Sequence, residues 1–197
     1  MSQIVEAMSN AELLGMIVGS KTAVRMLKDA GGSLSALLNE TIAPYGPQPK
    51  VQTKLQVAKE LVRRSLLETL SQGDALSSPA RVREYLRMTL AGREHEVFMV
   101  LFLDAQNRVI ECEEMFRGTL TQTSVYPREV VKRSLFHNAG ALLLAHNHPS
   151  GLAEPSHADE TLTQALKQAL ALVDVRVLDH FIVAGTGILS FAEKGLL

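Results

Sequence analysis

The chain has 197 residues, and its 20 basic and 21 acidic side chains give a net charge of −1. The length fits one large domain or two small ones, and a hydrophobic content of 46% excludes wholesale disorder. The balanced charge excludes binding of nucleic acid through an overall positive charge of the chain. The single cysteine excludes a disulfide framework and a thiolate-rich zinc site.

Helices are predicted over roughly the first half of the chain, where apolar residues recur at helical spacing. Asn10 can cap the first of these helices. The predicted helices cover residues 11–18, 22–28, 51–70 and 80–90, with one more turn within 33–38. Three prolines and a glycine within residues 41–50 exclude regular structure in that stretch.

Strands enter the pattern after Arg93. Apolar or alternating segments predict strands over 96–104, 108–116, 141–145, 173–183 and 188–191, with helices over 127–136 and 156–172. This order predicts an α/β or α+β domain with one mixed β-sheet flanked by helices. The longest apolar run, residues 97–103, suits a buried strand and is far short of the about 20 residues that span a bilayer. With no signal peptide at the start, we expect a cytoplasmic protein without membrane attachment.

A histidine pair follows the apolar strand at 141–145. His146 and His148 are two residues apart, so on a strand their side chains share one face and can converge on one ion. Asp159 lies in the first turn of the next predicted helix, which the intervening loop can fold back over the strand end. Two imidazoles and one carboxylate make a three-ligand zinc site with a fourth position open, which is the catalytic pattern.

The same residues have a plainer interpretation. Ser156 and Asp159 have the spacing of a capping box, which is common at helix starts. Capping alone predicts no shared centre between Asp159 and His146. The two interpretations are compatible, because a helix N-terminus favours anionic groups.

A zinc hydrolase also needs a base for its water. Glu94 and Glu96 precede the apolar strand at 97–103, and either can lie near His146. We favour Glu96 because it adjoins the strand, which fixes its position better. The alternative is that both are ordinary surface carboxylates.

The segment from His146 to Asp159, with a glutamate upstream, resembles the JAMM (MPN+) metalloprotease signature. The closer resemblance is to the RadC family of bacterial proteins, and it extends over about residues 93–197. The matching segments are Glu96 with the strand after it, Y-P-R-E-V at 126–130, H-N-H-P-S-G at 146–151, L-D-H at 178–180 and E-K-G at 193–195.

This resemblance implies a JAMM fold and a set of roles. His146, His148 and Asp159 become zinc ligands, Glu96 holds and deprotonates the water, and the Ser156 hydroxyl helps to stabilise the oxyanion. The implied substrate is a peptide or isopeptide, although RadC proteins have also carried a DNA-repair label. For His180, within L-D-H, we expect a role in orienting a ligand rather than ligation.

The N-terminal part departs from the family pattern. RadC proteins usually begin with helix-hairpin-helix elements, so we predict a helical domain of that kind over residues 1–78 and a metallohydrolase domain over 79–197. Pro44 stands where the first glycine of the DNA-binding turn would be. Pro47 and Pro49 remove N–H donors that would contact DNA phosphate. A local basic stretch remains, which is either a solvated helix face or a DNA-binding surface: Lys50, Lys54, Lys59, Arg63 and Arg64, against Glu60 alone.

Overall fold

The structure is a computed structural model, and it describes residues 5–34, 37, 49–118 and 125–197. The chain divides into two compact units, Met1–Arg64 and Ser65–Leu197. Helix α5 (Pro49–Gln72) begins in the first unit and ends in the second. The domain boundary after residue 78 stays a prediction.

The N-terminal unit is helical, with α2 (Asn10–Val18), α3 (Ser20–Asp29) and the first part of α5. Its small core includes Leu14, Met26 and Leu55. The cap of α2 is Ser9 rather than the predicted Asn10, because the Ser9 side chain accepts the Glu12 N–H in a capping box. The proline-rich residues 41–48 and half of the turn predicted within 33–38 lie outside the described residues.

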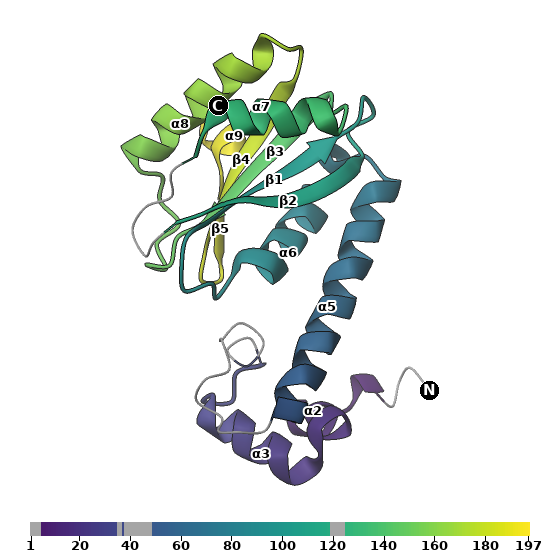
Figure 1. The fold of residues 1–197 in the computed structure, drawn as a ribbon. Helices are drawn as coiled ribbons and strands as arrows, with labels where there is room; N and C mark the ends of the chain where they lie inside the picture. The colour runs from purple at the N-terminus through teal and green to yellow at the C-terminus, as the bar shows by residue number, and fades with distance from the viewer. Residues whose placement is uncertain (1–4, 35–36, 38–48, 119–124) are drawn as a thin grey trace. The chain divides into compact units, whose positions relative to one another are not determined.

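The C-terminal unit confirms the predicted mixed sheet (Figure 1). The described strands run in the order β2-β1-β3-β4-β5, with β3 and β4 parallel and the other neighbours antiparallel. The strands are β1 (Val97–Leu103), β2 (Val109–Arg117), β3 (Ala141–Asn147), β4 (Arg176–Ala184) and β5 (Gly187–Ser190). The helical elements are η1 (Ala75–Ser77), α6 (Pro79–Leu90), α7 (Pro127–Phe136), α8 (His157–Ala171) and α9 (Phe191–Lys194).

Helices cover both faces of this sheet, which explains why β1 is apolar at every position. Val97, Met99 and Leu101 face a core completed by α6 and the end of α5. Phe98 and Val100 face a second core completed by α7 and α8. His146 of β3 lies on the side of this second core, because it pairs with Phe98.

Two predicted boundaries in the C-terminal unit are wrong for local reasons. Strand β4 begins at Arg176 rather than at Val173, because Asp174 has a left-handed φ of 57° within a turn that ends α8. The chain after β5 forms the short helix α9, which was not predicted. Ser190 caps that helix, and the Asp179 carboxylate accepts the Ala192 N–H.

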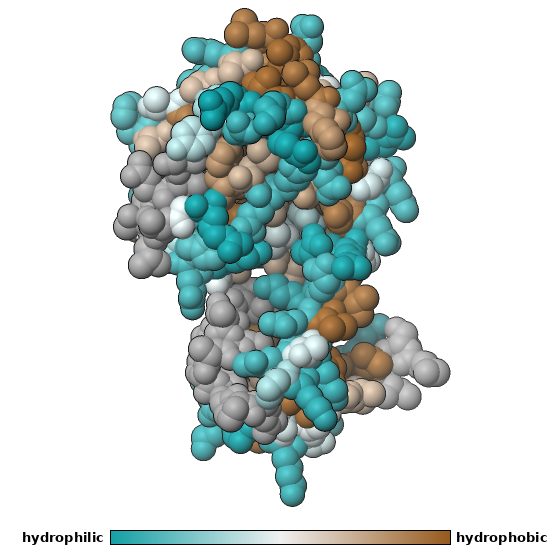
Figure 2. Space-filling view, viewed as in Figure 1, coloured by the Kyte–Doolittle hydropathy of each residue, from teal (hydrophilic) through white to brown (hydrophobic). Residues whose placement is uncertain are grey.

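Within the described residues, no helix is both long enough and apolar enough to cross a membrane. Figure 2 shows apolar side chains gathered where α8 ends, and Leu172 there is 87% exposed. Fifteen helical residues make α8 about 22 Å long, so this apolar patch is remote from the helix start.

Candidate metal centre

Three predicted side chains meet at the start of α8. The His146 and His148 Nε2 atoms are 2.9 Å apart. Asp159 Oδ1 lies 3.3 Å from His146 Nε2, and Asp159 Oδ2 lies 3.5 Å from His148 Nε2. In the described part of the chain, no other group of three histidine, cysteine or carboxylate side chains converges in this way. We call these three residues the metal cluster.

The local fold explains the convergence. Strand β3 runs on through His146 to Asn147, so the alternation of side chains directs His146 and His148 to the same side. Ser156 then caps α8, and Asp159 closes the capping box by accepting the Ser156 N–H through Oδ2. The cap therefore orients the Asp159 carboxylate, and Oδ1 is left facing His146.

Hydrogen bonds fix which nitrogen of each cluster histidine carries a proton. His148 Nδ1 lies 3.0 Å from the Leu152 carbonyl, which can only accept, so Nδ1 is protonated and Nε2 faces the cluster. His146 is fixed by a chain of contacts. The Thr163 hydroxyl donates to the Asp159 carbonyl, so His180 Nδ1 must donate to Thr163 Oγ1. Neutral His180 then accepts from His146 Nδ1 through Nε2.

This hydrogen-bond chain turns Nε2 of both His146 and His148 toward the same point, with the two atoms 2.9 Å apart. Two lone pairs at that distance repel each other unless a proton or a metal ion lies between them. The buried charge of Asp159 adds to this demand for a cation.

The electrostatics of the site agree with that requirement. Burial alone would raise the pKa of Asp159, but hydrogen bonds from His146 and His148 outweigh it and hold the pKa well below its usual range. The hydrogen bond to Asp159 raises the pKa of His148, against the effect of burial. Burial lowers the pKa of His180, and the nearby His146 adds to that effect, so His180 is neutral.

The donor atoms also fit a metal ion by distance. Ligand atoms around a tetrahedral ion with bonds of about 2.0–2.1 Å are about 3.3 Å apart. The shortest separations in the metal cluster are 2.9, 3.3 and 3.5 Å, the last two to different oxygens of Asp159. With one ligand atom from each residue, all three lie within 4.8 Å of one another, so the metal cluster could hold a metal ion.

Glu96 precedes β1 at the end of the strand that lies beside His146. Phe98 of β1 pairs with His146 of β3 in an antiparallel ladder, and the ladder ends at this pair. Glu96 lies two residues beyond Phe98, just as His148 lies two residues beyond His146. Glu96 is half-buried, and its charge contributes to raising the pKa of His148. Glu94, the alternative base, is exposed.

Ser156 lies beside the cluster, but its hydroxyl has a structural role. Ser156 Oγ donates to Asp159 Oδ2 at 2.7 Å and accepts the Asp159 N–H at 3.2 Å. The role of Ser156 as an oxyanion donor stays a prediction.

The sequence pointed to His180 but not to its partners. Thr163 is fully buried on α8, four residues after Asp159, and its hydroxyl bridges the Asp159 carbonyl and His180. Asn147, which is 3% exposed, binds the chain around Glu96. The only sequence signal for either residue was a polar side chain on an otherwise apolar face, which is common and unspecific.

The basic stretch on α5 is partly neutralised within the chain. Arg63 and Arg64 both form ion pairs with Glu60, at 2.8 Å each. Hydrogen bonds from Arg63 and Arg64 lower the pKa of Glu60 to about 2. Lys54 donates to the Ile17 carbonyl. These contacts favour a solvated helix face over a dedicated DNA surface.

Comparison with known proteins identifies the family to which the chain belongs. The sequence model of the RadC-like JAB domain matches residues 76–196. The chain belongs to the RadC family. A UPF0758 protein of Herminiimonas arsenicoxydans is 55% identical over 201 residues, which cover 96% of this chain and 90% of that protein. UPF0758 proteins of Nitrosomonas eutropha (96% of this chain, 90% of that protein) and Thiobacillus denitrificans (100% and 93%) are 53% and 52% identical.

The family assignment agrees with the architecture of this RadC-family chain. Its five-stranded mixed sheet between helical layers is consistent with a JAB fold, and the metal cluster lies within the matched residues. The names of these relatives state no reaction and no ligand.

Proposed function

We propose that this RadC-family protein is a zinc-dependent hydrolase that cleaves an amide bond in a peptide or isopeptide. The observation that carries the proposal is the convergence of two Nε2 atoms, 2.9 Å apart, beside an ionised carboxylate. Two imidazoles and one carboxylate leave a tetrahedral ion one open position, which is the pattern of catalytic rather than structural zinc sites.

Each residue then has a chemical role. Zinc held by the metal cluster would lower the pKa of a water to about 7 and polarise the amide carbonyl. Glu96 accepts the proton of the attacking water and delivers it to the leaving nitrogen, so that the amine departs neutral. Ser156 must turn its hydroxyl away from Asp159 to donate to the oxyanion, whose stabilisation by one donor is worth about 3 kcal/mol.

The first test is metal content. Protein purified without added metal and measured by elemental analysis should hold about one zinc per chain, the stoichiometry of a three-ligand site. The His146→Ala and His148→Ala variants should lose it, and the Glu96→Gln variant should keep it. Wild-type protein without stoichiometric metal would refute the proposal.

The second test is turnover on a defined probe. Zinc-loaded protein is incubated with a peptide mixture from a bacterial lysate digested with trypsin, and new termini are counted by mass spectrometry. Wild type should create new termini and Glu96→Gln should not, since the Gln side chain has no carboxylate that can accept a proton from the water. Equal cleavage by both proteins would refute the role of Glu96. No cleavage by folded, zinc-loaded wild type would count against a peptidase.

A DNA-binding role with structural zinc is the alternative function. It rests on the basic stretch of α5, where Glu60 already pairs with two of the cations. We therefore favour the hydrolase. Salt-dependent DNA affinity that disappears when Lys54, Arg63 and Arg64 are replaced together by Gln would reverse this preference.

A further inference from the structure

Strands β1 and β3 stop pairing beside the metal cluster. Their ladder runs from Leu103 opposite Ala141 to Phe98 opposite His146 and ends there. Strand β3 continues along β4, where Asn147 pairs with Val183 and the His148 N–H donates to the Val183 carbonyl. The sheet therefore splits between β1 and β3 at the level of Glu96 and His148.

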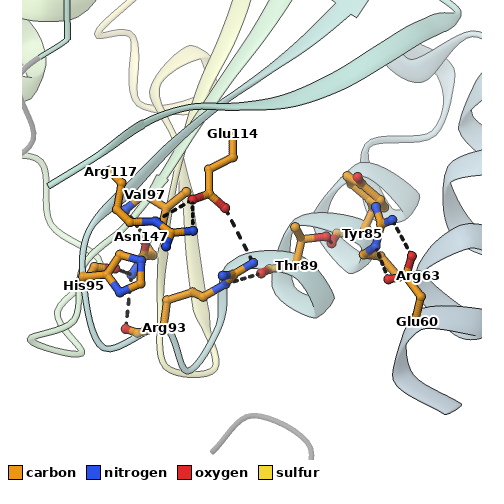
Figure 3. Close-up of polar contacts among 10 residues, drawn as sticks. All are labelled: Glu60, Arg63, Tyr85, Thr89, Arg93, His95, Val97, Glu114, Arg117 and Asn147. Atoms are coloured by element: carbon orange, nitrogen blue, oxygen red, sulfur yellow. Dashed lines mark hydrogen bonds and ion pairs between the residues drawn. The ribbon is translucent and has the colours of Figure 1, made fainter. Parts of the chain in front are cut away.

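The side chain of Asn147 bridges this split (Figure 3). At the ladder position opposite Val97, Asn147 Oδ1 accepts the Val97 N–H at 2.8 Å. Asn147 Nδ2 donates to the His95 carbonyl at 3.1 Å and to the Arg93 carbonyl at 3.4 Å. A side chain thus replaces the backbone ladder, and the carboxamide accepts from an N–H through its oxygen and donates to two carbonyls through its nitrogen.

The groups that Asn147 holds are the two peptide units on either side of Glu96. The His95 carbonyl belongs to the unit before Glu96, and the Val97 N–H belongs to the unit after it. The carbonyl of that second unit accepts the Gly118 N–H at 2.9 Å. Both peptide planes around Glu96 are therefore fixed, which determines where its side chain leaves the backbone.

Asn147 also stands between the two cluster histidines in sequence. Because side chains alternate along β3, His146 and His148 face the cluster and Asn147 faces the opposite side, toward residues 93–97. One strand end thus carries two of the three ligands and the hydrogen-bonding group that holds Glu96. A shift of this strand end moves both together.

We propose that Asn147 is a positioning residue for Glu96: its carboxamide holds the general base in register with the metal cluster across the split between β1 and β3. This inference rests on the proposed hydrolase function and names the residue that sets its base. Asn147 lies on the other face of β3, so it acts through the backbone around Glu96 and touches neither metal nor substrate.

The test uses the full chain loaded with cobalt(II), whose visible absorption reports on groups around the ion. The pH midpoint of the spectral change is measured in wild type, Glu96→Gln and Asn147→Ala. Removing the negative charge of Glu96 favours the ionised form of the coordinated water, so the midpoint should fall by about one pH unit in Glu96→Gln. Asn147→Ala lets Glu96 move away, and its midpoint should fall by about half as much.

Two further variants separate positioning from a general loss of structure. Asn147→Leu keeps the approximate volume of the side chain but removes the acceptor for Val97 N–H and both donations, so its midpoint should match that of Asn147→Ala. Arg93→Met removes the side-chain contacts of Arg93 with Thr89 and Glu114 but keeps the backbone carbonyl that Asn147 binds. Its midpoint should equal that of wild type.

The outcomes distinguish this inference from the proposed function. If Glu96→Gln shifts the midpoint and both Asn147 variants leave it unchanged, the positioning role is wrong and the hydrolase proposal stands. If Glu96→Gln itself leaves the midpoint unchanged, the base assignment fails and the role of Asn147 fails with it. If both Asn147 variants lose stoichiometric cobalt, Asn147 supports the metal ligands rather than Glu96, which also overturns the proposal.

Discussion

Replacing His180 by Phe should weaken metal binding without touching a ligand. In wild type, His180 Nε2 lies 2.9 Å from His146 Nδ1 and accepts its proton. That acceptor keeps the His146 Nε2 lone pair available for a metal. Phe keeps an aromatic ring where the His180 ring packs against Phe98 and Phe191, with ring centroids 5.7 and 4.8 Å away.

The magnitude follows from where the His146 proton can go. In the metal-free variant the proton moves to Nε2, where Asp159 Oδ1 lies 3.3 Å away, so little is lost. Metal binding returns the proton to Nδ1, which is then buried without an acceptor, since His146 is 1% exposed. Such a donor costs about 1–3 kcal/mol, and loss of a partner of this kind typically lowers metal affinity about 10- to 100-fold.

The assay is competition for zinc against a chromophoric chelator at fixed pH. Thr163→Val should lower the affinity in the same direction and by less, because it removes the hydroxyl that fixes the His180 proton. Thr163→Ser keeps that hydroxyl and should match wild type. Ser134→Ala is the matched control, since Ser134 is also fully buried and also donates to a carbonyl four residues earlier.

The reasoning would be refuted by zinc affinities of His180→Phe and Thr163→Val that both stay within about threefold of wild type, well below the typical loss. An equal loss in Ser134→Ala would show that general destabilisation, rather than the His146 proton, explains the effect.

Three further predictions concern stability and can be checked by urea denaturation of the metal-free protein. The pKa of His148 is raised above 6.5 in the folded state by its hydrogen bond to Asp159. The contribution of His148 to the free energy of unfolding is therefore fully present below pH 6.5 and is lost as the pH rises through the folded pKa. If the pH dependence of the free energy of unfolding is the same in His148→Ala as in wild type, this prediction is wrong. Ser156→Ala removes the α8 cap and should cost about 1 kcal/mol, so an unchanged midpoint would argue against the cap. Leu144→Ala leaves a cavity in a fully buried strand and should cost about 2–5 kcal/mol, against about 0.5 or less for exposed Leu172→Ala.

The sequence predicted the sheet and the convergence of His146, His148 and Asp159, because both leave short-range signals. The run of apolar residues in β1 reflects burial on both faces, and the histidine pair depends only on the alternation of one strand. The ends of elements were harder, because they depend on single hydrogen bonds. Ser9 rather than Asn10 caps α2, and α9 depends on Asp179, whose carboxylate accepts the Ala192 N–H from thirteen residues away in sequence.

The residues around the ligands could not be predicted for a related reason. Thr163 and His180 are 17 residues apart and meet only because α8 packs on β4. Asn147 and Val97 are 50 residues apart and meet only because β3 pairs with β1 up to His146. Tertiary contacts determine the hydrogen-bond partners of each of these polar side chains. The sequence alone therefore cannot distinguish such a side chain from an ordinary buried polar residue.

Capping and metal ligation by Asp159 are compatible at the level of sequence, and the geometry links the two. Oδ2 accepts the Ser156 N–H and the Ser156 hydroxyl, both at 2.7 Å, which holds the carboxylate plane. Oδ1 then faces His146 at 3.3 Å. Without the cap, the Asp159 side chain would be free to change rotamer until the metal bound. Metal binding would then carry the entropy cost of fixing the side chain, which would weaken the affinity. The helix start therefore orients the ligand before the metal arrives, so loss of the Ser156 cap should lower metal affinity as well as stability.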